Sequence, residues 1–309
     1  MADLPITTAT ASLGTTGADT LLRFLATQFV RIGRNMSNPL RYVMDVSAEI
    51  ASVGQTVGVY VAPEVSSALL TDGNAKSLND SAGTTANVTL NRNRISSFSL
   101  TTMARAMDGD FTSMKLLDTH IRAVLNGVEE DVLSLATSFT TNAFAGTFNT
   151  ALTEAECVEA VQKLMDQRAP GPYVGIVDPG ATSWSALMQI ANFVQARGAS
   201  NPWVSVNPNW GAGYFWNETF WYPSQAVNVT GTSTSNLVFS PSAIAVAMRL
   251  PPPPKGGGVI VENVVDGESG IALQILHQYD SSRLADEAVV RCLYGYAVTR
   301  NAFGVELRS

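Results

Sequence analysis

The feature that most constrains the fold is a long amphipathic stretch near the middle of the chain. Apolar side chains recur there every three or four positions over about six turns, which corresponds to about 33 Å of helix. They are Met114, Leu117, Ile121, Leu125, Val128, Val132 and Leu135. The segment Asp108-Gly109-Asp110 precedes this stripe. About three heptads without matched flanking charges argue against a coiled coil and favour a long helix lying on a sheet.

Alternating apolar residues predict two strands before this helix. The first run contains Val57, Val59 and Val61, and the second contains Val88 and Leu90 and, after a break, Phe98 and Leu100. A polar stretch rich in Gly, Asn, Asp and Ser, residues 71–85, lies between them. Long excursions of this kind tend to be functional. We therefore expect a projecting β-hairpin arm, with a disordered loop as the alternative.

Three further helices are predicted from capping residues and helical spacing. Residues 19–33 begin with Asp19 and carry Leu21, Leu25 and Phe29 at helical intervals. Thr153 and Glu156 have the spacing of a capping box. The buried face of the helix after Thr153 is predicted to hold Val158, Val161, Leu164 and Met165. A further helix is expected to bury Trp184, Leu187, Met188, Ala191 and Val194.

The remainder of the chain reads as strands with one short helix. Apolar runs predict strands at Tyr173–Val177, Leu237–Phe239, Ile271–Leu276, Ala288–Val298 and Val305–Leu307. Ser240-Pro241 is expected to open a short helix over Ser242–Met248, because proline is tolerated in the first turn. Residues 198–236 look like loops and short strands whose tryptophans pack an irregular subdomain or a subunit contact. The fold class is therefore α+β.

Composition favours an assembling protein over one that grips nucleic acid. Charged residues make up 15% of the chain, against about 25% in ordinary soluble proteins. Interfaces between subunits are depleted in charge in the same way, although a buried core gives part of this signal. The formal net charge of −7 opposes binding to phosphates. The first five residues lack the basic region of a signal peptide, and no run of about 18 apolar residues predicts a membrane span.

The sequence offers no specific reason to propose an enzyme, a metal or a cofactor. His120 and His277 are the only histidines, so no two-histidine zinc motif exists, and both are interpreted as structural. Cys157 and Cys292 lie far apart and are interpreted as buried thiols. No phosphate-binding glycine loop or nucleophile elbow is present. The acidic run Glu129–Asp131 is interpreted as a solvated helix face.

The order of these parts resembles the major capsid proteins of tailed bacteriophages, which have the Hong Kong 97-like fold. Leu237–Ala247 is similar to the family's strand-to-helix segment, and Gln278-Tyr279-Asp280 with Arg291–Val298 is similar to its closing strands. The resemblance implies an N-arm (1–50), an E-loop (51–107) and a spine helix with part of the P-domain (108–170). It further implies an A-domain (171–285) and P-domain return strands (286–309).

What the resemblance implies about function is assembly into an icosahedral shell around double-stranded DNA, in hexamers and pentamers. The DNA would be enclosed without sequence-specific binding. Partners would be a separate scaffolding protein, a portal and decoration proteins, with assembly in the host bacterial cytoplasm. An encapsulin-like compartment and another virion part, such as a decoration or tail protein, are the alternatives. The expected inter-subunit contacts are basic residues of the first two segments: Arg23, Arg31, Arg34, Lys76, Arg92 and Arg94. Lys76 is also a weak candidate for covalent cross-linking.

Overall fold

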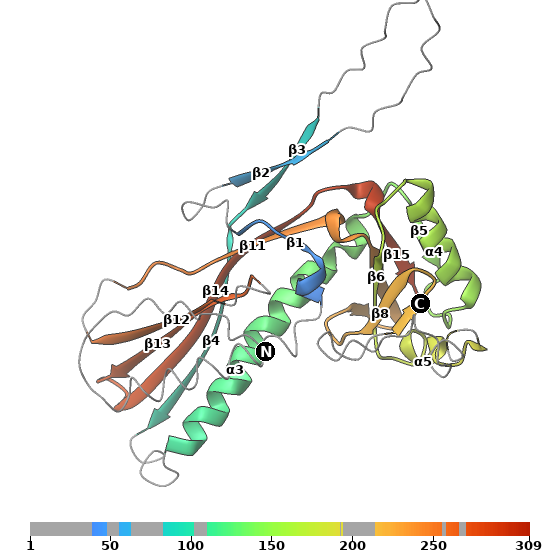
Figure 1. Ribbon diagram of the computed structural model, residues 1–309. Coiled ribbons are helices and arrows are strands. Elements are labelled where there is room, and N and C mark those ends of the chain that lie inside the picture. The colour runs from blue at the N-terminus through green and yellow to red at the C-terminus, as the bar shows by residue number, and fades with distance from the viewer. Residues whose placement is uncertain are drawn as a thin grey trace, which may run out of the picture.

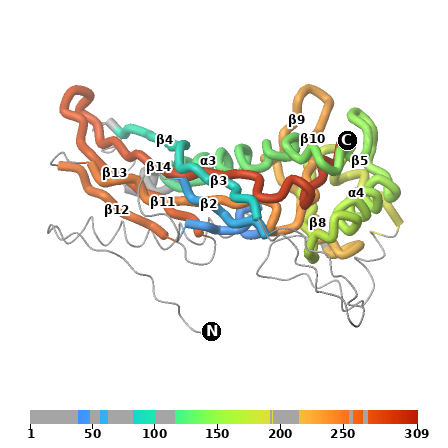
Figure 2. The backbone as a smooth tube through the Cα atoms, turned by 90° about the horizontal axis from the view of Figure 1, so that it is seen from above, coloured from blue at the N-terminus to red at the C-terminus, as the bar shows by residue number. Residues whose placement is uncertain are grey.

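The computed structural model describes residues 39–47, 56–62, 83–101, 110–191, 193, 214–254, 258–265 and 270–309. These residues form two β-sheets joined along one long helix, with a two-stranded arm that projects from the body (Figure 1). Viewed at right angles, the molecule is elongated, with the sheets at opposite ends (Figure 2). The predicted N-terminal helix (19–33) lies outside the described residues.

The first sheet has six strands and carries the long helix α3 (Asp110–Leu133) on one face (Figure 1). Its strands run in the order β1-β11-β14-β13-β12, and β4 pairs with β14. Their bounds are Met44–Asp45 (β1), Arg92–Thr101 (β4), Ile244–Arg249 (β11), Val259–Val265 (β12), Ala272–Asp280 (β13) and Ala285–Val298 (β14). β12 was not predicted. A short 3-10 helix, Pro39–Tyr42, precedes β1.

The predicted apolar stripe is the buried face of α3. Leu117, Ile121, Leu125, Val128 and Val132 are all at most 5% exposed, in a core shared with β13 and β14. The helix ends at Leu133 and continues as a 3-10 turn, Ser134–Ser138. A helix about 36 Å long, packed on a sheet, therefore forms the axis of the molecule.

The second sheet has seven strands and lies at the other end of α3. Its order is β5-β15-β10-β6-β8-β7, and β9 pairs with β10. The bounds are Phe144–Gly146 (β5), Tyr173–Val177 (β6), Tyr214–Trp216 (β7), Thr219–Pro223 (β8), Asn228–Thr230 (β9), Ser233–Phe239 (β10) and Gly304–Arg308 (β15). Helices α4 (Glu154–Asp166) and α5 (Trp184–Leu187) lie at this end (Figure 1).

Two connections, which we call the chain crossings, pass between the two sheets and lie next to each other. The chain leaves β10 through the 3-10 turn Pro241–Ala243 and enters β11, and it leaves β14 through Asn301–Phe303 and enters β15. Backbone hydrogen bonds tie the crossings together, from Thr299 N to Ala243 O at 2.9 Å and from Ser240 N to Phe303 O at 2.9 Å. Residues 171–285 and 286–309, the ranges expected to form an A-domain and P-domain return strands, therefore each contribute strands to both sheets.

The helix predicted over Ser242–Met248 is wrong, because these residues enter strand β11. Both edges of β11 are paired, with β1 on one side and β14 on the other. Ile244, Val246 and Met248 face the main core, while Ala245 and Ala247 face a second, smaller core. A strand buried on both faces has a continuous apolar run, and periodicity alone does not distinguish it from a buried helix segment.

Helix α4 begins with the predicted capping box but buries a different face. Thr153 Oγ1 accepts from Glu156 N, and the Glu156 carboxylate accepts from Thr153 N at 2.8 Å. The buried residues are Cys157, Ala160, Val161 and Leu164, whereas Val158 and Met165 are 41% and 43% exposed. Small side chains at 157 and 160 let the helix approach the sheet, so the contact centres on them. The predicted face was therefore half wrong.

The helix expected over Trp184–Val194 is shorter than predicted. Within the described residues, α5 spans Trp184–Leu187, Ala191 is exposed, and Met188 is only partly buried against the core. Val194 lies outside the described residues, as do two of the tryptophans of the region, Trp203 and Trp210. Trp216 and Trp221 do pack together, with ring centroids 6.2 Å apart.

The predicted hairpin arm is present as β2 (Thr56–Val61) and β3 (Thr84–Thr89). The strands pair antiparallel over their full length, from Thr56↔Thr89 to Val61↔Thr84. The second predicted run, which has a break after Leu90, is divided between β3 and β4, and β4 pairs with β14 instead of extending the hairpin. Most of the polar stretch 71–85 lies outside the described residues.

Both cysteines are free and fully buried, as predicted. Burial raises the pKa of each thiol to about 12, so neither is a thiolate at neutral pH. No helix in the described part of the chain combines the length and the apolar character that crossing a membrane requires.

Candidate assembly interface

The arm is fixed to the body by the second core, at its root. Val57, Val88 and Leu90 from the arm pack against Val46, Ala245, Ala247 and Leu293 of the six-stranded sheet and its approach. All seven side chains are at most 8% exposed. The root of the arm is therefore a packed joint, and the direction in which the arm projects is set by the sheet beneath it.

Gly295 allows the arm to lie directly on β14. A Cβ atom at this position would overlap the carbonyl oxygen of Thr89, the last residue of β3. The obstacle is main chain, so it cannot rotate away as a side chain would. Glycine is required here for close approach of two backbones, and not for an unusual backbone conformation.

Below the root, a polar junction joins α3 to β4 and β14. We call the four residues Arg92, Arg94, Asp131 and Tyr294 the Asp131 junction. Arg94 Nη2 lies 2.9 Å from Asp131 Oδ1, Arg92 Nη1 lies 3.1 Å from Oδ2, and the Tyr294 hydroxyl donates to Oδ2. Arg94 Nε also donates to the Tyr294 hydroxyl at 3.1 Å. The carboxylate is thus held by three donors from two strands.

The acidic run Glu129–Asp131 is therefore not the solvated face that the sequence predicted. Glu130 is exposed, but Glu129 is only 4% exposed, and Asp131 is partly buried within the junction. Consecutive helical residues point in different directions, so one position of an acidic run can face the sheet while its neighbour faces water.

Burial and hydrogen bonding act in opposite directions on the Asp131 carboxyl group. Burial alone raises its pKa, but the hydrogen bond from Tyr294 and the guanidinium groups of Arg94 and Arg92 outweigh burial and hold the pKa below its usual value. For Tyr294, burial and the neighbouring carboxylate raise the pKa to about 12. Asp131 is consequently ionised and Tyr294 protonated at neutral pH, which is the combination that the hydrogen bonds require.

The junction also explains a glycine in the middle of a long helix. A Cβ at Gly127, one turn before Asp131, would overlap the guanidinium group and Cδ of Arg94. Glycine costs about 1 kcal/mol relative to alanine inside a helix. This loss of helix stability is offset because the glycine leaves room for Arg94 to reach Asp131.

Gly127→Ala is expected to lower the free energy of unfolding by about 1 kcal/mol, despite the better helix propensity of alanine, because Arg94 must leave Asp131. In the Arg94→Ala background the same substitution should instead stabilise the protein by about 0.5–1 kcal/mol. Urea unfolding of the four variants measures both effects. A stabilising Gly127→Ala in the wild-type background would contradict the assigned role of the glycine.

The depressed pKa of Asp131 predicts a contribution to stability that is present at neutral pH and is lost in acid. A carboxyl group with a lower pKa in the folded state stabilises the protein above its unfolded-state pKa of about 3.9, and this contribution is lost as the pH falls through the folded pKa. Asp131→Asn should therefore be less stable than wild type by about 1–2 kcal/mol at pH 7. The two proteins should converge towards pH 2. Equal differences at pH 7 and pH 2 would indicate that packing, and not charge, accounts for the effect.

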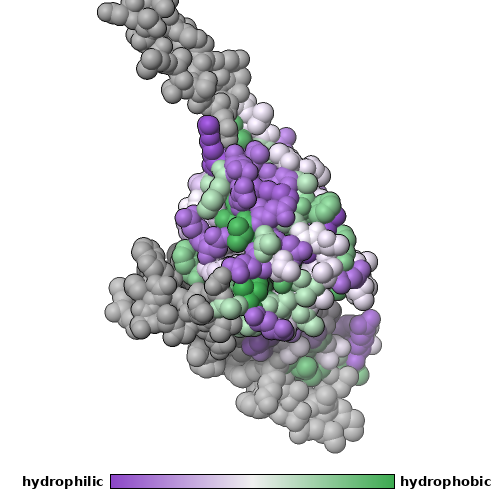
Figure 3. Space-filling view, turned by 90° about the vertical axis from the view of Figure 1, so that its right-hand side faces the viewer, coloured by the Kyte–Doolittle hydropathy of each residue, from purple (hydrophilic) through white to green (hydrophobic). Residues whose placement is uncertain are grey.

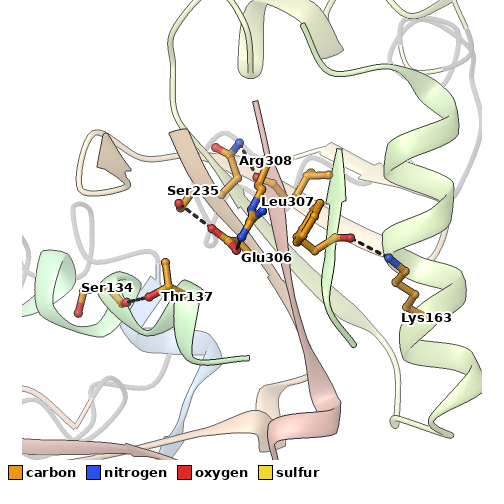
Figure 4. A network of polar contacts seen from close by, with 9 residues as sticks. Ser134, Thr137, Lys163, Ser235, Glu306, Leu307 and Arg308 are labelled. Carbon is orange, nitrogen blue, oxygen red and sulfur yellow. Dashed lines mark hydrogen bonds and ion pairs between the residues drawn. The ribbon is translucent and has the colours of Figure 1, made fainter. Parts of the chain in front are cut away.

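A second polar cluster fixes one edge of the seven-stranded sheet (Figure 4). Glu306 is 4% exposed, accepts from Ser235 Oγ at 2.8 Å and pairs with Arg308 at 2.8 Å. The Arg308 guanidinium lies 3.6 Å from the ring centroid of Phe144 on edge strand β5. Lys163 of α4 donates to the carbonyl oxygen of Phe144 at 2.8 Å. This edge is thus fastened by charged side chains.

The surface of the described residues has scattered apolar side chains. Figure 3 shows polar and apolar side chains mixed over the face at the seven-stranded end. Away from that end, the exposed large apolar side chains lie on the arm, on strands of the six-stranded sheet and in the turn before β14: Tyr60, Ile95, Ile260, Val265, Tyr279 and Leu284. Apolar side chains exposed singly are ordinary on a protein surface, so they do not by themselves mark an interface.

Of the six predicted contact residues, the structure describes two. Arg23, Arg31, Arg34 and Lys76 lie outside the described residues. Arg92 and Arg94 lie together on β4, and both contact Asp131 of the same chain. Arg92 additionally lies 4.6 Å from the ring centroid of Tyr296. Sequence reasoning missed Asp131 and Tyr294, and the one signal for them was the glycine a turn before Asp131.

The described residues contain no cluster of His, Cys, Asp and Glu that could hold a metal ion. His120 has a structural environment: its ring stacks on Phe98 with centroids 4.9 Å apart, and its Nδ1 lies 2.6 Å from Ser96 Oγ. The buried thiols are not poised as nucleophiles. The described part of the chain presents a projecting arm, two sheet ends and the packed joints that orient them.

No protein-family model matches the sequence, and no curated protein matches it in sequence. Solved structures do match in fold. The capsid structure of the cyanophage P-SCSP1u has a TM-score of 0.56 at 11% identity, over 86% of this chain and 86% of that one. The asymmetric unit of the bacteriophage PhiM1 mature capsid has a TM-score of 0.51 at 10% identity, over 99% and 91%.

A chain of the holo-SrpI encapsulin complex from Synechococcus elongatus PCC 7942 matches with a TM-score of 0.51 at 13% identity, over 96% of this chain and 95% of that one. A structure from Mycobacterium phage Che8 matches with a TM-score of 0.53 at 14% identity, over 86% of this chain and 89% of that one. The chain therefore has the α+β fold of phage capsid structures.

Proposed function

We propose that this chain is the major capsid protein of a tailed double-stranded DNA phage, and that it assembles into the icosahedral shell. The observation that carries the proposal is the likeness in fold to phage capsid structures over nearly the whole length of both chains. The low charge content and the projecting arm support it, because both are typical of a subunit whose surface is covered by its neighbours.

The two sheets divide the proposed capsid elements along the chain. The six-stranded sheet with α3 serves as the P-domain and its spine helix. The seven-stranded sheet with α4 and α5 serves as the A-domain. In this division the A-domain takes residues 139–243 and the last strand β15, and the P-domain takes strands β1 and β4 together with residues 110–138 and 244–298. The arm, with its extension over residues 63–82, serves as the E-loop, and residues 1–38 as the N-arm.

The proposed mechanism is association through many modest contacts. Arms that overlie neighbouring subunits exchange backbone hydrogen bonds and bury apolar side chains that the free subunit leaves exposed. Repetition of these contacts around hexamers and pentamers gives a stable shell by avidity. A net charge of −7 on each subunit opposes tight binding of the enclosed DNA by the chain. Separate scaffolding, portal and decoration proteins complete the proposed virion, which assembles in the host cytoplasm, and no catalytic role is proposed.

Electron microscopy of the purified protein tests the proposal. Negatively stained samples of the protein, alone and co-expressed with the product of the neighbouring gene, should contain closed icosahedral particles or capsomers. Soluble monomers under both conditions, or tubes and isolated trimers, would contradict a major capsid role. Trimers or tubes would favour a decoration or tail protein instead.

An encapsulin-like compartment is the second candidate, and the match to the holo-SrpI encapsulin complex favours it. The contents of particles isolated from the native host separate the two functions. Double-stranded DNA with a portal protein supports the phage shell. A single co-purifying enzyme in place of DNA supports the compartment.

A further inference from the structure

A cavity of about 450 Å³ opens beside the root of the arm, where the arm meets the two chain crossings. Val59 and Val61 of β2 form one wall, and Phe303 from the second crossing forms another. Arg168 and Arg300 also line it, and none of the described residues that line it is acidic. The cavity therefore combines apolar walls with two positive charges.

The two arginines are available for an acidic ligand. Arg168 follows α4, is exposed, and has a backbone φ of +53° that directs the chain sharply at this point. Arg300 donates from Nη2 to the carbonyl oxygen of Ala62 at 2.8 Å and lies 4.8 Å from the ring centroid of Phe303. Within the described part of the chain neither arginine forms an ion pair, so no described carboxylate compensates either charge.

The segment that extends the arm has the complementary chemistry. Residues 63–82 contain three carboxylates, Glu64, Asp72 and Asp80, against one lysine, Lys76. Apolar residues are interspersed with them: Val65, Leu69, Leu70 and Leu78. An acidic segment with apolar side chains suits a pocket with two arginines and apolar walls.

The register of the hairpin favours a second copy as the source of this segment. Val61 and Thr84 are still paired at the end of the described arm, so the two strands of the hairpin extend from the root side by side. The 20 residues between Ala62 and Gly83 can extend about 33 Å beyond that point when they double back on themselves. In a ring of identical subunits every arm would meet the same cavity on the next subunit, so one heterologous contact would be repeated around the ring.

We infer that the cavity at the arm root receives the acidic segment 63–82 of a neighbouring copy, with Arg168 and Arg300 binding its carboxylates. This inference rests on the proposed shell function and adds to it a receptor site for the arm. It assigns to Arg168 and Arg300 a role in selecting the partner segment. Arg300 has a second role, because it also fastens Ala62 of its own arm.

Disulfide trapping between two variants that each carry one added cysteine tests the contact directly. Asp72→Cys places a thiol on the segment, and Ser242→Cys places one in the cavity lining. The native thiols are fully buried and do not compete. An equimolar mixture, assembled under reducing conditions and then oxidised, should give a disulfide-linked dimer in particles. Unassembled subunits should not give it, and neither should particles that pair Asp72→Cys with Thr150→Cys, an exposed control position at the seven-stranded end.

Charge reversal supplies the second readout. Arg168→Glu should slow assembly by about tenfold, because a charge at the rim of an interface acts mainly on the association rate. Mixing this variant with Asp72→Lys/Asp80→Lys subunits should restore the rate. Arg168 suits this test better than Arg300, because Arg300 also donates a hydrogen bond to Ala62 of its own arm. The backbone φ of +53° at position 168 is equally unfavourable for arginine and for glutamate, so the substitution changes the charge and not the backbone strain.

The outcomes separate this inference from the proposed function. Normal particles without the cross-linked dimer, or without any effect of Arg168→Glu, would overturn the receptor site and leave the shell function standing. A further variant that carries Asp72→Cys and Ser242→Cys in one chain serves as a control. An intramolecular disulfide in its free subunits would show that the segment folds onto its own cavity, which also overturns the inference. If the unmodified protein forms no particles with its neighbouring gene product, the proposed function fails and the inference fails with it.

Discussion

Leu125→Asp is expected to abolish soluble, folded protein. Leu125 is 1% exposed and lies midway along the buried stripe of α3, between the helix and the six-stranded sheet. An aspartate there loses the apolar contacts of leucine and places a carboxylate where no cation is available among the described core residues. The combined cost is about 5 kcal/mol or more, which is comparable to the entire stability of many domains.

Ala123→Asp is the matched control, because it adds the same charge to the exposed side of the same helix. Its free energy of unfolding should stay within about 0.5–1 kcal/mol of wild type. Soluble yield, circular dichroism and urea unfolding distinguish the two variants. Normal particles formed by Leu125→Asp would show that the stripe does not face the core and that α3 is misplaced.

The sequence predicted well those elements whose pattern of apolar residues fits only one kind of secondary structure. The stripe over residues 114–135 has no competing interpretation as a strand, because it continues for about six turns. The capping box at Thr153 and the arm strands are likewise local signals. The two strands of the arm are joined by a single connection, so their pairing could be anticipated.

The prediction failed where burial from both sides removes the periodicity. Residues 244–248 are apolar throughout because β11 lies between two cores, and their alanines suit a helix as well as a strand. On α4, the small residues Cys157 and Ala160 define the contact with the sheet, whereas hydrophobicity alone favours the larger Val158 and Met165. Both errors arise because the partner surface, and not the segment itself, decides which side is buried.

The Asp131 junction could not be predicted because it depends on tertiary pairing. Arg94 and Tyr294 are 200 positions apart and meet only because β4 pairs with β14. An arginine in a strand and an aspartate on a helix are each ordinary surface residues until that pairing is known. Gly127 was the one local clue, because a glycine inside a strong helix requires a neighbour that needs the space.

Replacing residues 63–82 by Asn-Gly is expected to leave a folded subunit that does not assemble. The hairpin supports this design, because Val61 pairs with Thr84 and a two-residue Asn-Gly turn closes antiparallel strands with the correct twist. Ala62 is retained, so its hydrogen bond from Arg300 survives. The second core at the arm root is untouched. The free energy of unfolding should therefore change by no more than about 1 kcal/mol, since loop closure depends only weakly on length.

Assembly should respond far more strongly, because every copy loses its reach onto a neighbour and the deficit is repeated at each contact in the shell. Light scattering and negative-stain microscopy, at concentrations where the unmodified protein forms particles, should detect none for the shortened variant. A variant of unchanged length in which Thr71, Ser77 and Ser81 become alanine serves as the control and should assemble normally. Particles of normal size and yield from the shortened subunit would show that the segment is a surface loop, and the arm would then have no part in holding the shell together.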